Sequence, residues 1–257
     1  MEDYIYILAI AGGFLAGVIN TLAGSGSLIT LPILIFLGLP AYVANGTNRL
    51  GVVLQTMVSV FTLHKRGNLD LKGSGWLIVP AILGAIPGAY IAVDLSDQLL
   101  KHVIGAVMII MLIPLIMNAD KWLRESSEEG QRHKRWYVVI TFILIGAYGG
   151  FIQAGVGIML LSGMVLLAGF SISRANGLKN LIVLCFSVPA LAVFLMNDQV
   201  NWELGLLLGS GQMLGGWVAA RFAMENESMA VWVRRLLILM IILSAVELFD
   251  LRVLLGF

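Results

Sequence analysis

Charged residues are scarce in this sequence. Asp, Glu, Lys and Arg make up 12% of its 257 residues and hydrophobic residues 59%, whereas an ordinary soluble domain carries about 25% charged residues. The mean hydropathy is +0.94. So little charge cannot cover a water-exposed surface, which excludes a soluble fold. The composition predicts an all-α integral membrane protein whose main partner is the lipid bilayer.

Cysteine, histidine and net charge are equally sparse. The single cysteine, Cys185, excludes an intramolecular disulfide. His64, His102 and His133 fall at or near loops, without the spacing of a metal site, so we expect no metal and no cofactor. A net charge of +1 without a basic, aromatic-rich run indicates no nucleic-acid partner. The sequence leaves the oligomeric state open.

Long apolar stretches dominate the sequence instead. One helical crossing of a hydrocarbon core needs about 20 apolar residues. Such stretches occupy 4–22, 43–63, 75–93, 99–117, 136–153, 175–196, 204–224 and 231–248, and two shorter runs occupy 28–37 and 158–170. The first stretch lacks the positive flank of a cleavable signal peptide and is predicted to remain a membrane helix.

The sequence repeats itself with a constant offset. Ala44-Asn45-Gly46 returns as Ala175-Asn176-Gly177, 131 positions later, and the same offset brings Ala23-Gly24-Ser25-Gly26 onto Ala154-Gly155-Val156-Gly157. Gly38 and Gly84 fall on Gly169 and Gly215 in the same register. Glycine-rich membrane helices could match by chance, but a gapless run favours a duplicated unit. We expect a first repeat at 1–118, a cytoplasmic loop at 119–135 and a second repeat at 136–257.

Basic residues give the two repeats opposite orientations. The loop with Lys65, Arg66 and Lys72 is basic, whereas its counterpart at 195–203 has no lysine or arginine. Other basic groups are Lys121, Arg124, Arg132, Lys134 and Arg135, and Arg221, Arg234 and Arg235. Basic loops face the cytoplasm. An inverted repeat needs an odd number of crossings, so we expect five segments per half with both termini outside, or hairpins in place of the short runs.

Two glycine-rich segments are predicted to interrupt membrane helices. They contain Gly24, Ser25, Gly26 and Ser27 in the first half and Gly155 and Gly157 in the second, where Gln153 directly precedes the break. Non-helical backbone at membrane depth is tolerated only when it is buried in protein or lines a cavity. A helix that starts there offers free N–H groups to an anion. The alternative is that these glycines only allow close helix packing.

Arg49 and Lys179 lie several residues inside apolar segments. A cation at membrane depth costs about 3 kcal/mol or more unless it is paired or hydrated. Few carboxylates lie within the predicted helices, so a negatively charged substrate is a reasonable compensator. Polar neighbours that could bind its oxygens are Asn45, Thr47, Asn48, Asn176 and Asn180. The alternative is that both cations snorkel to opposite membrane surfaces.

These motifs resemble a known family. The glycine-rich break, the run Leu31-Pro32-Ile33-Leu34-Ile35-Phe36-Leu37-Gly38-Leu39-Pro40, the segment from Val43 to Asn48 and the loop from Lys65 to Asp70 are similar to the sulfite exporter TauE/SafE family of membrane transporters. The resemblance covers nearly the whole chain. It implies secondary transport of small sulfur-containing or organic anions, such as sulfite, sulfonates or sulfoacetate, across a plasma or bacterial inner membrane.

The sequence therefore predicts two inverted repeats of about five membrane segments, with short broken helices after the breaks, that move a small anion by alternating access. An anion channel would use the same residues and stays open as an alternative. An intramembrane enzyme built on Ser25 is a second alternative, but its nucleophile would need a base within hydrogen-bond reach, and no histidine lies inside a predicted helix at a depth similar to that of Ser25.

Overall fold

The computed structural model describes residues 3–72, 74–116, 136–223, 235, 237–239 and 241–242. Within these ranges the chain forms helices and turns but no strand. The helices of the first half are α1 (Asp3–Ala23), α2 (Ser27–Phe36), α3 (Ala41–Lys65), α4 (Gly75–Val93) and α5 (Asp97–Ile116). Those of the second half are α7 (Trp136–Phe151), α8 (Val156–Ser162) with η1 (Gly163–Leu167), α9 (Ile172–Met196) and α10 (Trp202–Val218) with η2 (Ala219–Ala223).

Each predicted membrane segment corresponds to a helix in the part of the chain that the structure describes, although residues such as 152–153 and 168–170 lie outside the helices. Four described helices, α1, α4, α5 and α9, contain stretches long and apolar enough to cross a membrane. With 25 residues, α3 also reaches about 37 Å at 1.5 Å per residue, but it carries buried polar side chains such as Asn45, Asn48 and Gln55. The chain is thus an all-α membrane protein, and its most polar long helix turns those side chains into the bundle.

Some predictions lie outside the described residues. They are the loop 119–135 with Lys121, Arg124, His133 and its other basic residues, Arg234, and most of the segment 231–248. The first half has five helices, of which α2 is only 10 residues long, so five crossings and a hairpin both stay predictions. The segment count of the second half stays a prediction.

The backbone repeats at the spacing found in the sequence. Helix α3 begins at residue 41 and ends at 65, and α9 begins at 172 and ends at 196, so both bounds differ by 131. Positive φ angles recur at the same spacing: 68° at Gly24 and 72° at Gly155, 93° at Gly38 and 68° at Gly169, and 73° at Gly67 and 54° at Asp198. The two halves therefore turn the chain at equivalent points.

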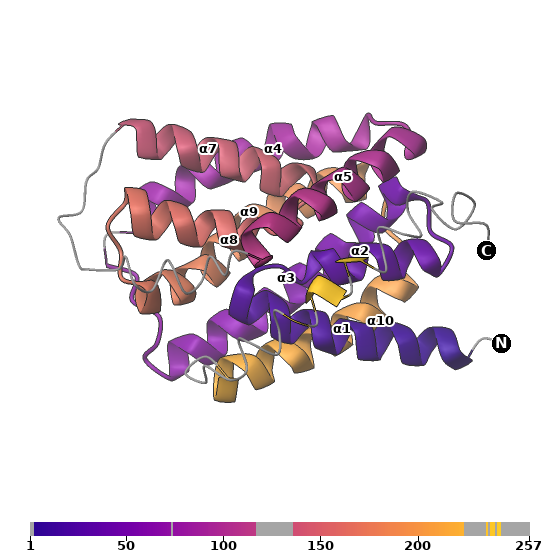
Figure 1. The fold of residues 1–257 in the computed structure, drawn as a ribbon, viewed down its shortest axis with the longest axis horizontal. Coiled ribbons are helices and arrows are strands. Elements are labelled where there is room, and N and C mark those ends of the chain that lie inside the picture. Colours follow the sequence, from indigo (N-terminus) through magenta and orange to yellow (C-terminus); the bar gives the residue numbers. More distant parts are fainter. Residues whose placement is uncertain are drawn as a thin grey trace.

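The halves exchange contacts across the centre of the molecule (Figure 1). Helix α1 packs on α10 and α4 on α7, while α3 and α9 contact each other between these pairs. Helix α1 starts at the side where the N-terminus lies, whereas α7 starts at the opposite side. Gly46 lies against the carbonyl of Gln199, and Gly177 against the carbonyl of Asn68, which are equivalent positions. These reciprocal contacts fit two inverted halves.

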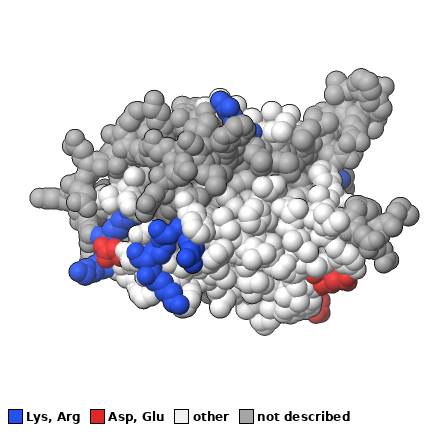
Figure 2. All heavy atoms as spheres, turned by 90° about the horizontal axis from the view of Figure 1, so that it is seen from below, with Lys and Arg blue, Asp and Glu red and all other residues white. Residues whose placement is uncertain are grey.

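Charged side chains gather at the ends of the molecule. Figure 2 shows basic residues at one end of the visible face and a middle zone with almost no charge. Near the basic end, Arg66 donates a hydrogen bond to the carbonyl of Arg221, and Arg174 forms a 3.1 Å ion pair with Asp70. The uncharged zone matches the hydrocarbon core, and the basic end fits the predicted cytoplasmic side.

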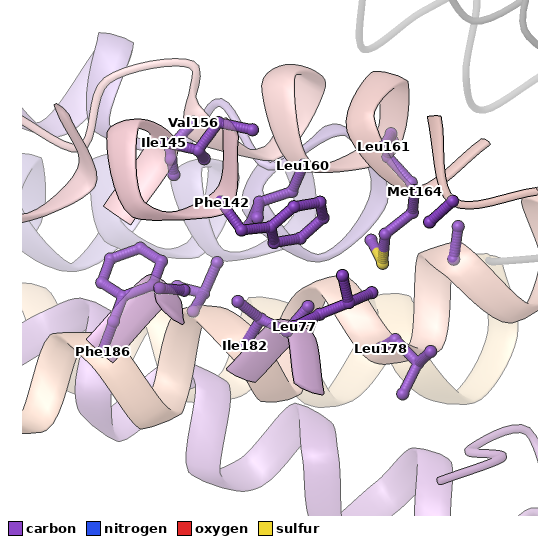
Figure 3. Close-up of a cluster of buried hydrophobic side chains, with 14 of the residues drawn as sticks. Leu77, Phe142, Ile145, Val156, Leu160, Leu161, Met164, Leu178, Ile182 and Phe186 are labelled. Carbon is purple, nitrogen blue, oxygen red and sulfur yellow. The ribbon is translucent and has the colours of Figure 1, made fainter. Parts of the chain in front are cut away.

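Two apolar clusters lie on either side of the central helices. One fills the space between α4, α7, α8 and α9, where Phe142, Leu77, Met164 and Phe186 have no exposed surface (Figure 3). The other joins α1, α2 and α5 to the second break through residues such as Leu28, Met108 and Ile158. Lipid is as apolar as these side chains, so close packing rather than burial holds such clusters together.

Candidate functional site

The two glycine-rich breaks touch each other at the centre of the bundle. The N–H of Gly157 donates to the carbonyl of Gly24 over 3.1 Å. A Cβ atom built on either glycine would overlap the Cα atom of the other. At Gly24 the φ of +68° also favours glycine. These breaks bring four helix ends together: the C-termini of α1 and α7 and the N-termini of α2 and α8.

Arg49 closes the carbonyl end of α7. Its two terminal nitrogens donate to the carbonyls of Gly149 over 2.5 Å and Gly150 over 2.7 Å, and Asn45 donates to the carbonyl of Phe151 over 2.8 Å. The guanidinium carbon lies 5.1 Å from the ring centroid of Phe194. Arg49 is 0% exposed. A side chain from the first half thus caps a helix of the second half.

Lys179 closes the carbonyl end of α1 in the reciprocal way. Its Nζ donates to the carbonyls of Thr21 over 3.0 Å and Leu22 over 2.8 Å, and to Oδ1 of Asn176 over 3.4 Å. Asn180 adds a 3.4 Å hydrogen bond to the carbonyl of Thr21. Lys179 is 1% exposed. A side chain from the second half thus caps a helix of the first half.

The burial of both cations contradicts the alternative that they reach the membrane surfaces. Neither side chain snorkels, because both are buried. Their immediate partners are backbone carbonyls, which we had not predicted. The last carbonyls of a helix have no partner within the helix, and its C-terminus carries about half a negative charge. A buried cation at that point satisfies both needs.

The N-terminus of α2 differs from that of α8. In the first half Asn48 holds the first turn of α2, donating to Oγ of Ser27 over 2.9 Å and accepting from Oγ1 of Thr30 over 2.5 Å. The N–H groups of Leu28, Ile29 and Thr30 donate to the carbonyls of Ser25 and Gly26, whereas no described group accepts from the N–H groups of Gly26 and Ser27. In the second half the Gly157 N–H is taken by Gly24, so the expectation that it is a free donor for an anion is wrong. At the start of α2 the N–H groups of Gly26 and Ser27 therefore remain open donors.

Several buried polar atoms around the second break lack a hydrogen-bond partner. They are Nε of Arg49, Oδ1 of Asn45 and Oε1 of Gln153. Gln153 also has a φ of +70°, which is uncommon for a residue with a side chain and has no counterpart in the first half. Strained backbone and unsatisfied polar groups concentrate at functional sites. The second break therefore holds both a free donor and free acceptors.

Other predicted residues are engaged elsewhere. Thr47 accepts a 2.9 Å hydrogen bond from the N–H of Asn201 at the start of α10, away from the breaks. Ser25 donates to the carbonyl of Ala23 over 3.4 Å, and Gly155 lies against the sulfur of Met111. These three positions shape the site rather than offer free groups to it.

A buried polar network lies beside the first break. Gln55 accepts from Asn20 over 2.5 Å and donates to the hydroxyls of Thr21 and Ser59 over 2.8 and 2.9 Å. Asn20 and Gln55 can be found in the sequence as polar residues in apolar stretches. Thr21 and Ser59 cannot be found in this way, because single hydroxyls are common in membrane helices. The network joins α3 to the end of α1.

A model of the sulfite exporter TauE/SafE family matches residues 9–248. The chain belongs to this family. It is similar to a probable membrane transporter protein, ORF9, of Sinorhizobium sp., at 30% identity over 91% of this chain and 88% of the relative. It is also similar to a probable membrane transporter protein of Haemophilus influenzae, at 24% identity over 83% of each chain. The probable membrane transporter YdhB of Bacillus subtilis is 24% identical over 84% of this chain and 86% of its own length.

No solved structure matches the chain. The family match and these relatives show that the chain is a membrane transporter, which moves a small molecule across a lipid bilayer, and not an enzyme. The intramembrane enzyme built on Ser25 is therefore set aside. The break region described above is the candidate site of this transporter.

The contact between the breaks predicts a steric effect. Gly157→Ala should lower the thermal stability of the detergent-solubilised protein by about 1–3 kcal/mol, because its Cβ overlaps backbone that a side chain cannot push aside. Gly75→Ala is the control, since no atom outside its own helix turn lies within 4 Å of that Cβ. Equal stability of the two variants, measured by thermal unfolding, would refute the close approach.

The cap on α1 predicts a second effect. Lys179→Met keeps the length of the side chain but leaves the carbonyls of Thr21 and Leu22 without this donor, at a cost of about 1–3 kcal/mol. Lys101→Met, near the start of α5, should change stability far less. A Lys179→Met protein as stable in thermal unfolding as the Lys101 control would show that the cap contributes nothing.

Proposed function

We propose that this TauE/SafE protein is a secondary transporter of small anions, in particular sulfur oxyanions or organosulfonates of the sulfite and sulfoacetate type. The observation that supports this most directly is the burial of the Arg49 guanidinium without an ion-pair partner among the described residues. Arg49 also keeps its Nε unpaired. The family description supports a sulfur compound as the substrate, and the positive charge of the site supports an anion.

The charge balance at the second break favours an anion. Arg49 brings one positive charge, and the carbonyl end of α7 offsets about half of it. The uncapped N-terminus of α2 adds about half a positive charge nearby, since Asn48, next to Arg49 in α3, bonds the first turn of α2. The sum is a net positive region in a medium where charge is screened little. A monovalent anion would compensate it.

The free groups also fit an oxyanion. Arg49 Nε and the N–H groups of Gly26 and Ser27 at the start of α2 would donate to its oxygens, as helix N-termini do in many anion sites. The amide oxygens of Asn45 and Gln153 would accept from the hydroxyl of a partly protonated anion. Such a substrate would carry its own proton, so the described helices would need no separate carboxylate for coupling.

The inverted halves support alternating access. Arg49 and Lys179 are buried, which supports a carrier whose site is closed to both surfaces in this conformation. Related halves that pack around one site can open it in turn to each side. Here the halves meet at the Gly24–Gly157 contact and at the two reciprocal caps, and rocking about that centre would carry the substrate across.

The proposal predicts that charge at position 49 matters more than capping. Arg49→Lys keeps the cation, whereas Arg49→Gln keeps an N–H donor for the α7 carbonyls and loses the charge. Both variants should fold, as judged by expression and gel filtration. In vesicles, uptake of radiolabelled sulfite should be retained in part by Arg49→Lys and fall at least tenfold in Arg49→Gln. Equal transport by Arg49→Gln and the unaltered protein would remove Arg49 from the site.

The substrate class predicts selective stabilisation. Sulfite, sulfate, thiosulfate, sulfoacetate, taurine and simple carboxylates would be added to the purified protein during thermal unfolding. A ligand at 100 times its dissociation constant stabilises the folded state by about 2.7 kcal/mol. We expect sulfite or a sulfonate to give this shift and Arg49→Gln to lose it. A shift with carboxylates alone would contradict the sulfur class but not the anion site.

A further inference from the structure

A groove on the bundle surface lies away from the helix breaks. It encloses about 790 Å³ between the C-terminal part of α3 and the end of α10. Its apolar wall comes from Met57, Val58, Phe61 and Trp217. Met57 and Phe61 remain 53% and 59% exposed. This wall lies along the outer surface of the bundle, where acyl chains would contact it.

Three cations close one end of the groove. Lys65 places its Nζ 4.3 Å from the ring centroid of Phe61, and Arg221 places its guanidinium carbon 5.5 Å from that of Trp217. Arg66 donates to the carbonyl of Arg221 and so joins the two helices across the groove. None of the three forms an ion pair with a described carboxylate. Their charge is therefore available to a ligand.

The groove is basic in only one half of the repeat. The positions equivalent to Lys65 and Arg66 are Met196 and Asn197, and the position equivalent to Arg221 is Tyr90. Helix packing alone would not require three cations in this half and none at the equivalent positions of the other half. They lie at the basic end of the molecule, near the bilayer surface, where aromatic and basic residues meet lipid headgroups.

We propose that this groove binds one anionic phospholipid. Its headgroup phosphate lies between Lys65, Arg66 and Arg221, and an acyl chain lies along Met57, Phe61 and Trp217. A soluble anion would leave the apolar wall unused, and a zwitterionic lipid would bring its own cation toward the three basic groups. Basic pockets at this depth recognise acidic headgroups. The lipid holds α3 to the end of α10 through its headgroup phosphate and its acyl chain.

The test is native mass spectrometry of the full-length protein in detergent, with equimolar phosphatidylglycerol and phosphatidylcholine. The variant Lys65→Gln/Arg66→Gln/Arg221→Gln removes the three charges of the groove. The control Lys72→Gln/Lys101→Gln/Arg174→Gln removes the same number elsewhere. Each basic group near an acidic surface is worth about a fivefold change in affinity.

We expect the unaltered protein and the control to retain phosphatidylglycerol in preference to phosphatidylcholine, and the groove variant to lose that preference by at least tenfold. Inorganic phosphate at the same concentration should not displace the lipid. Equal retention of both lipids by the unaltered protein, equal loss in both triple variants, or displacement by free phosphate would each overturn the proposal. These outcomes do not depend on Arg49 and leave the anion transport proposal untouched.

Discussion

A helix that ends inside a membrane must satisfy its last carbonyls without water, and this constraint governs the centre of the protein. Helices α1 and α7 both end at glycine-rich breaks in the interior. Lys179 and Arg49 bind the free carbonyls and oppose the negative ends of the two helix dipoles. The free energy lost by burying each cation is offset by its hydrogen bonds to carbonyls that have no partner within their own helix. Without these side chains the last carbonyls of both helices would lack these donors at a depth where water cannot replace them.

The caps also tie the two halves together. Arg49 reaches from α3 to α7, and Lys179 from α9 to α1, so each half completes a helix of the other. The breaks add a direct backbone contact at Gly24 and Gly157. Any opening of the centre toward one side therefore changes the surroundings of a buried charge. A substrate that binds there can thus be coupled to the movement of the halves, because each buried cation lies at a helix end that belongs to the other half.

Much of the fold could be predicted from the sequence. Apolar stretches and glycine breaks are local signals, and the helix bounds of α3 and α9 repeat the sequence offset to the residue. The partners of Arg49 could not be predicted, because they are backbone carbonyls 100 and 101 residues away. Every residue has a backbone carbonyl, so the sequence does not mark which of them a side chain will bind. The open N-terminus of α2 and the closed one of α8 have similar sequences. They differ because Gly157 bonds Gly24, a contact only the assembled fold creates.

The central claim is that the breaks and Arg49 hold a small oxyanion. Anomalous diffraction from crystals grown with selenite, a heavier analogue of sulfite, tests it most directly, because selenium marks the position of the bound anion. The account predicts a selenium peak within hydrogen-bond reach of the Arg49 guanidinium and the start of α2, absent from Arg49→Gln crystals. A selenium peak only at the surface cations, or one that persists at the breaks in the Arg49→Gln protein, would contradict it.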